Sequence, residues 1–213
     1  MTLAAFSLLD LLADDGPDES QDERITDAAL AAFMEFGIRR TSMGEIAKRA
    51  AISPATLYRR FSGKDHLVWT VGRREVRRLI ALVDAQVNVA DTPEEQVVTM
   101  ATAFLSALRQ NALLHRLLST EPEIVLPLLT TQGGVVLALG RAYVADFIRR
   151  VQAAAGPPAF DPEPVAEMVA RVALSLALTP ETSLPVNDDA AFRLFARRHI
   201  AGALGLSAVS ATP

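Results

Sequence analysis

Two helix start signals stand close together in the first third of the chain, and they constrain the fold more than any other feature. Ser42-Met-Gly-Glu45 is a capping box, in which the Ser42 hydroxyl and the Glu45 carboxylate satisfy each other's free backbone amides. Ser53-Pro54 is a second start, because serine is a favoured N-cap and proline fits the first helical position. The sequence therefore predicts two short helices joined by a tight turn.

The two helices are expected over residues 43–50 and 54–60, which makes them a helix-turn-helix unit. Their shared core would consist of Ile46, Ile52 and Leu57. The position in the turn that is often glycine is Ala51. If Ala51 adopts a left-handed backbone conformation, the strain is about 1–2 kcal/mol, which the fold can tolerate.

Helical periodicity continues on both sides of this unit. A helix from Arg24 ends at Gly37, where glycine is a favoured C-terminal cap. Its apolar stripe consists of Ile25, Ala29, Ala32, Phe33 and Phe36. A second capping box, Ser62-Gly-Lys-Asp65, opens a helix over residues 64–87 that is about 35 Å long. This helix can connect two domains, with Leu79, Leu82 and Val83 facing the second of them.

The rest of the chain stays helical in pattern, without the alternation typical of strands, so we expect an all-α protein. Further helices are expected over residues 93–111, 111–119, 123–155 (with a bend at Gly133-Gly134), 163–178 and 188–206. The chain then divides into an acidic, disordered arm, a helix-turn-helix domain with its connector helix, a larger helical domain and a tail. These segments are residues 1–22, 23–87, 88–206 and 207–213.

Charge is distributed unevenly along the chain, although the net charge is only −4. Residues 1–23 hold seven acids and no base, whereas residues 24–78 hold twelve Lys/Arg against five Asp/Glu. A basic segment inside an acidic chain is the electrostatic footprint that nucleic-acid binding requires. A solvated helix face has the same composition, so the charge alone leaves both interpretations open.

The stretch from Thr41 to Leu67 resembles the tetracycline-repressor (TetR) family of bacterial transcriptional regulators. The similarity lies in Ile46-Ala47, Ser53, Thr56-Leu57-Tyr58 with Phe61, Lys64 with Leu67, and the preceding helix that ends in Phe36-Gly37. Ala51 and Arg60 depart from the commonest form of the motif. The motif covers about residues 22–70, and it implies a small DNA-binding domain joined by its fourth helix to a ligand-binding and dimerising domain.

The resemblance assigns DNA contacts to the helix starts and to one face of the second short helix. The residues it implies are Ser42, Ser53, Pro54, Ala55, Thr56, Tyr58, Arg59, Arg60 and Lys64. Ser42 and Lys64 would contact phosphates at helix N-termini, which offer free amides and a positive dipole end, and Tyr58 would do so through its hydroxyl. Arg59 and Arg60 can grip guanine O6 and N7. The arginines that follow, Arg73, Arg74, Arg77 and Arg78, are expected on a solvated face of the connector helix.

The helix expected over residues 163–178 is apolar nearly all round and needs cover on every side. A second subunit can supply it, and the resemblance implies a homodimer; a central position in a monomer's core is the alternative. The candidate interface residues are Val165, Met168, Val169, Val172, Leu176, Phe192 and Phe195. A ligand pocket is expected between the preceding helices, lined by Met100, Phe104, Leu108, His115, Tyr143 and Phe147. Such a lining favours an apolar or amphipathic effector.

Catalysis is not expected. The chain has no cysteine, and His66, His115 and His199 stand far apart without a metalloprotease motif. Neither a nucleophile-elbow nor a phosphate-binding loop sequence is present, so we expect no enzyme activity, cofactor or metal. No membrane span or signal peptide is recognisable, and a cytoplasmic location is expected.

The expected function is a ligand-responsive repressor that binds a palindromic DNA operator as a homodimer and is released by a small effector. Two alternatives remain open from the sequence. One is a helical small-molecule-binding protein without DNA-binding activity, and the other is a DNA-binding activator.

Overall fold

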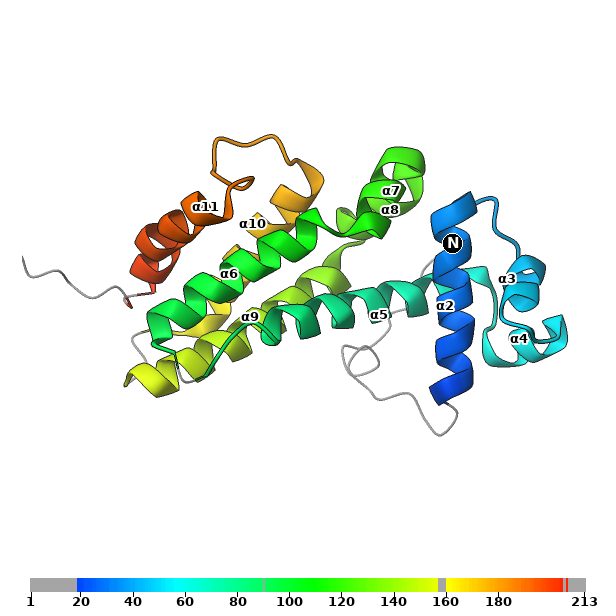
Figure 1. The fold of residues 1–213 in the computed structure, drawn as a ribbon, viewed down its shortest axis with the longest axis horizontal. Coiled ribbons are helices and arrows are strands. Elements are labelled where there is room, and N and C mark those ends of the chain that lie inside the picture. The colour runs from blue at the N-terminus through cyan, green and yellow to red at the C-terminus, as the bar shows by residue number, and fades with distance from the viewer. Residues whose placement is uncertain (1–18, 90, 157–159, 205, 207–213) are drawn as a thin grey trace, which may run out of the picture. The chain divides into compact units, whose positions relative to one another are not determined.

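The computed structural model describes residues 19–89, 91–156, 160–204 and 206, so most of the acidic arm and the tail lie outside the described residues (Figure 1). The described part of the chain is helical and contains no strand, which confirms the all-α prediction. Its helices are α2 (Glu19–Phe36), α3 (Met43–Arg49), α4 (Pro54–Arg60), α5 (Lys64–Asp84), α6 (Pro93–Arg109), α7 (Ala112–Thr120), α8 (Pro122–Leu129), α9 (Gly134–Ala155), α10 (Pro162–Leu178), α11 (Asp189–Phe195) and the π-helix Ala196–Ala201.

The structure divides into two compact units. Among the described residues, the first contains 19–78 and 112–132, and the second contains those of 79–111 and 133–206. This division differs from the expected boundary after residue 87, because the chain returns to the first unit through α7 and α8. Leu117 of α7 and Val125 of α8 are buried in the same hydrophobic core as the helix-turn-helix.

The first unit is organised around α2. This helix begins at Glu19, earlier than expected, and takes up the last residues of the predicted arm. Asp22 and Glu23 lie near its N-terminus, where the helix dipole favours negative charge. Most of the predicted stripe is buried, but Phe36 is 40% exposed and lies under the Arg49 guanidinium, 5.6 Å from it. The buried members are Ile25, Ala29, Ala32 and Phe33.

Several predicted helices have different bounds in the structure. The connector α5 ends at Asp84 rather than at residue 87. The single helix expected over residues 123–155 is two helices, since Thr130 leaves the helical region with φ −126° and ψ −97°. The last helix is also two elements, α11 and the π-helix that follows it.

The second unit is built from α6, α9, α10, α11 and the end of α5. Val83 is fully buried in it and Leu79 packs on the same core, but Leu82 is 57% exposed, so the prediction that it faces this domain is wrong. Helices α9 and α10 approach closely at Gly140 and Ala170. A Cβ added at Gly140 would lie only 3.4 Å from the Ala170 Cβ.

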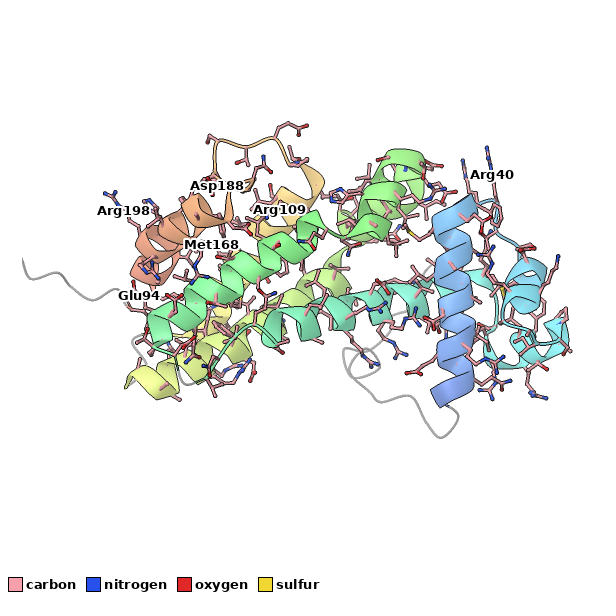
Figure 2. All side chains as sticks on the ribbon, in the orientation of Figure 1. Arg40, Glu94, Arg109, Met168, Asp188 and Arg198 are labelled. Carbon is pink, nitrogen blue, oxygen red and sulfur yellow. The ribbon has the colours of Figure 1, made fainter. Side chains whose placement is uncertain are left out.

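An arginine ties α6 to α11 within the second unit. Arg109 donates to the Val186 carbonyl and lies 2.5 Å from the Asp189 carboxylate, close to the N-cap residue Asp188 (Figure 2). Among the described residues, no single helix is long and apolar enough to cross a membrane. Two bent helix pairs, Pro93–Arg109 with Ala112–Thr120 and Pro122–Leu129 with Gly134–Ala155, meet that test of length and composition only when taken together.

Candidate nucleic-acid interface

The turn between α3 and α4 is closed by the backbone. The Ile52 amide donates to the Ala47 carbonyl at 3.0 Å, and the Ala51 amide donates to the Lys48 carbonyl at 3.1 Å. These two hydrogen bonds form a Schellman motif, whose central residue must be left-handed. Ala51 has φ +55°, so the left-handed conformation considered for it is confirmed. An alanine therefore occupies a position that glycine fills without strain.

Both predicted N-caps are present. The Ser42 hydroxyl accepts the Glu45 amide at 3.1 Å and starts α3. The Ser53 hydroxyl accepts the Thr56 amide at 3.1 Å, with Pro54 in the first turn of α4. Each cap fixes a helix start at the surface, where the remaining amides of the first turn point outward. Two helix N-termini can thus meet an anion from the same domain.

Helix α4 presents polar side chains to solvent. Tyr58 is 56% exposed, and Arg59, Pro54 and Ala55 are also exposed, while Leu57 on the opposite face is fully buried. Thr56 is half-buried, and its hydroxyl lies 2.9 Å from the Ser53 hydroxyl. A short helix with one buried residue and an exposed aromatic and arginine is suited to contact a partner through its outer face.

Arg60 has a different environment from Arg59. Its guanidinium donates to the Asp22 carboxylate of α2 at 2.7 Å, and its side chain is only 16% exposed. A base contact by Arg60 requires this ion pair to open. The role that the resemblance implies for Arg60 stays a prediction, and Arg59 is the arginine of α4 that is already accessible.

Lys64 lies at the start of α5, but its ammonium group is engaged with the backbone. Its Nζ donates to the carbonyls of Ile38 at 3.0 Å, Arg39 at 3.3 Å and Thr41 at 3.2 Å. An ammonium has three protons to donate. Lys64 thus holds the loop between α2 and α3, from which Arg40 extends into solvent (Figure 2). The predicted phosphate contact by Lys64 is untested, and it would compete with these bonds.

Glu121, which the sequence did not single out, holds the other side of the same loop. Its carboxylate accepts the Ile38 amide at 2.6 Å and the Arg39 amide at 2.8 Å, and its side chain is buried. Gly37 has φ +83° and leaves room for it, because a Cβ there would sit 3.0 Å from the Glu121 carboxylate. The only sequence signal was an acid directly before Pro122, and this signal did not identify its partner.

Two family models match the chain. Residues 25–69 match the model for bacterial regulatory proteins of the tetR family, and residues 94–197 match the model for the bacterial tetracyclin repressor C-terminal domain. The chain belongs to the TetR family. The first match covers the helix-turn-helix and the start of α5, so it contains both capped helices and Lys64.

Curated relatives of this TetR-family chain are similar over part of their length. The HTH-type transcriptional repressor KstR of Mycolicibacterium smegmatis is 34% identical over 92 residues, which are 43% of this chain and 45% of KstR. An uncharacterised HTH-type regulator of Mycobacterium tuberculosis, Rv1255c, is 32% identical over 124 residues, which are 57% and 60% of the two chains. The alignments thus span about half of these relatives.

Solved structures of TetR-family proteins share the fold over nearly the whole chain. The repressor AlkX from Dietzia sp., implicated in biodegradation of n-alkanes, has a TM-score of 0.63 at 18% identity, covering 86% of this chain and 97% of AlkX. The repressor QsdR of R. erythropolis has a TM-score of 0.60 at 20% identity, covering 92% and 100%. At these identities the likeness concerns the fold alone.

The predicted ligand residues of this TetR-family chain do not all lie in one unit. Met100, Phe104, Tyr143 and Phe147 belong to a single cluster of the second unit, and Leu108 is half-buried on α6. His115 is on α7 in the first unit and is exposed. The Tyr143 hydroxyl donates to the Asp84 carboxylate at 2.8 Å. Burial first, and then this contact with Asp84, raise the pKa of Tyr143, so it remains a hydrogen-bond donor.

The predicted interface residues include both exposed and packed side chains. Met168 (labelled in Figure 2) is 59% exposed and Val172 is 51% exposed on α10. The others pack within the second unit: Val165 and Val169 beside α9, and Leu176, Phe192 and Phe195 in the cluster that contains Val186. Among the described residues, no group of three or more His, Asp or Glu could hold a metal ion.

Proposed function

We propose that this chain is a DNA-binding transcriptional regulator that acts in the cytoplasm as a repressor. One observation carries the proposal: Tyr58 and Arg59 are exposed on α4, a helix that starts at a capped N-terminus directly after a left-handed turn. A second helix held in this way is the element that enters the major groove in helix-turn-helix proteins. Membership in the TetR family and the repressor KstR among its relatives support the same function.

Within this function, Arg59 reads bases and the helix starts bind phosphates. The Arg59 guanidinium has the planar fork that matches guanine O6 and N7. The capped starts at Ser42 and Ser53 and the Tyr58 hydroxyl contact the backbone, which fixes the register. Arg60 joins them only after it leaves Asp22. The exposed Arg40 is a further phosphate contact, because the loop that carries it is held next to α3.

The regulator binds DNA as a homodimer through α10, and it recognises an inverted repeat. The exposed pair Met168 and Val172 supports this interface, since two large apolar side chains one turn apart are stable at a surface when a partner covers them. An apolar or amphipathic effector binds among Met100, Phe104 and Phe147 of the second unit, with Tyr143 as its polar contact. His115, an exposed residue of α7 in the first unit, remains a predicted polar contact of the effector.

The test is binding to DNA from the gene's own upstream region, measured by fluorescence anisotropy at several salt concentrations. We expect a specific complex, and a footprint of the same DNA should have a dyad. Arg59→Ala should relax base preference at one or two positions per half-site, by about 1–3 kcal/mol each. Arg198→Ala, an exposed arginine of the second unit (Figure 2), is the matched control and should leave the preference unchanged. A chain that binds this DNA no better than unrelated DNA would contradict the proposal.

A further inference from the structure

A basic cavity lies in the first unit, beside the proposed reading helix. It has a volume of about 230 Å³, and its charged lining includes Asp22, Glu23, Arg60, Arg73, Arg74 and Arg77. Four of its lining residues are thus arginines and two are acids, and Asp27 and Glu75 also pair with one of the arginines, Arg74. Three of the arginines lie on α5 in a helical repeat, so they gather on one side of that helix. The cavity therefore favours an anionic occupant.

Arg74 offers hydrogen-bond donors to an anionic occupant of the cavity. Its Nη1 lies 2.8 Å from the Asp27 carboxylate, and its Nε lies 3.9 Å from the Glu75 carboxylate, beyond hydrogen-bond distance. Its Nε and Nη2 are buried and have no hydrogen-bond partner among the described residues. Buried guanidinium donors are costly to leave unsatisfied, and a carboxylate satisfies two of them at once. A carboxylate-bearing group is thus the chemistry that the cavity fits.

The part of the acidic arm that precedes α2, residues 10–18, carries carboxylates and joins the helix that lines the cavity. Residues 10–18 contain Asp10, Asp14, Asp15 and Asp18 and no base. The arm ends where α2 begins at Glu19, and Asp22, about 5 Å further along the helix axis, already lines the cavity. Nine residues can reach up to about 30 Å, so the arm has ample length to return to the arginines.

We propose that the acidic arm, residues 10–18, docks on the arginine cavity and competes with DNA for this side of the helix-turn-helix. The arm places several negative charges beside Arg60 and the N-terminal half of α5, next to the helix that carries Tyr58 and Arg59. Those charges repel the DNA phosphates and hold Arg60 away from the groove. The effect on DNA rests on the proposed function, whereas the docking itself does not.

Docking can be tested directly in the full-length chain, which supplies one fluorescent probe and allows a second to be attached. Trp69 is the only tryptophan and lies one turn before Arg73 on α5, and the absence of cysteine makes any introduced thiol unique. Ala13→Cys labelled with a dansyl acceptor reports proximity to Trp69 through energy transfer. We expect high transfer at about 0.02 M salt and a large loss at about 1 M, where the Debye length is about 3 Å.

Paired arginine variants locate the docking surface. Arg73→Gln with Arg77→Gln should lower the transfer at low salt to the high-salt level. Arg149→Gln with Arg150→Gln on α9 removes the same charge from the second unit and should leave the transfer unchanged. Transfer that is insensitive to salt, or equal in the two variant pairs, would overturn the docking. Displacement of the arm by millimolar phosphate at constant ionic strength would make a free anion the ligand and would also overturn it.

The competition with DNA has its own readout. Asp14→Asn with Asp15→Asn and Asp18→Asn should tighten DNA binding about fivefold at about 0.05 M salt, and the gain should vanish in the Arg73→Gln, Arg77→Gln background. An equal gain in both backgrounds would mean general repulsion and would overturn the competition. Absence of any DNA binding would contradict the proposed function instead, while the energy-transfer result would still stand.

Discussion

Lys64 and Glu121 bind the backbone of the same two residues, Ile38 and Arg39. The Glu121 carboxylate accepts the amides of Ile38 and Arg39, while the Lys64 ammonium donates to the carbonyls of those two residues. The loop between α2 and α3 is therefore fixed by one acid from the α7–α8 junction and one base from α5. Because this loop precedes the cap of α3, its geometry determines where the helix-turn-helix begins.

Lys64→Ala should destabilise the first unit as well as weaken DNA binding. The variant leaves three carbonyls without their charged donor, and hydrogen bonds to charged groups contribute about 1.5–3 kcal/mol. We expect the free energy of unfolding, measured in urea, to fall by about 1–3 kcal/mol. Lys48→Ala, an exposed lysine of α3, is the control and should change stability by less than about 0.5 kcal/mol.

The salt dependence of DNA binding separates two roles for Lys64. A phosphate contact would make the slope of log K against log salt flatter by about 0.9 per subunit in Lys64→Ala. A residue that only holds the loop would lower affinity equally at all salt concentrations. An unchanged free energy of unfolding together with the flatter slope would show that Lys64 is a phosphate ligand, as the family resemblance implies.

Glu121→Gln should also loosen the loop. The amide oxygen of glutamine can accept one of the two backbone amides, and its NH2 group meets the other as a second donor. Because the site is buried, leaving one amide unsatisfied costs about 1–3 kcal/mol. Glu123→Gln is the control: it removes an exposed ion pair with Arg39, 2.8 Å apart, which is worth about 0–1 kcal/mol. Chemical denaturation of the two variants measures the difference, and equal losses would contradict the role of Glu121.

The local signals in the sequence were sufficient for the helix-turn-helix and insufficient for the loop before it. The Ser42 and Ser53 hydroxyls accept amides three residues further on, and Pro54 directly follows its cap, so their pattern can be read from the chain directly. Glu121 acts on amides 82 and 83 residues away, and no spacing rule connects them. The exposure of Leu82 was missed for a related reason: a helix pattern shows an apolar position, but tertiary packing decides whether it is covered.

Ala51→Gly should stabilise the chain. Alanine at φ +55° carries about 1–2 kcal/mol of strain, and glycine removes it at a cost of about 0.4–1 kcal/mol in unfolded-state entropy. We expect a net gain of about 0.5–1 kcal/mol, seen as a rise in the denaturation midpoint. Ala31→Gly, at an exposed interior position of α2, is the control and should lose about 0.5–1 kcal/mol. A loss in both variants would mean that Ala51 is not strained.

Val172→Asp should separate the subunits without unfolding them. Val172 is 51% exposed in a single chain, so an aspartate there stays hydrated in the monomer. In a dimer that covers α10, the same charge would be buried without a partner, which costs several kcal/mol. Sedimentation should therefore show monomers, with the free energy of unfolding of the monomer nearly unchanged and DNA affinity reduced because only one half-site is bound. Val89→Asp, at another exposed valine outside α10, should remain dimeric. A Val172→Asp protein that sediments as a dimer would move the interface away from Met168 and Val172, and the packed residues of the second unit would then be core alone.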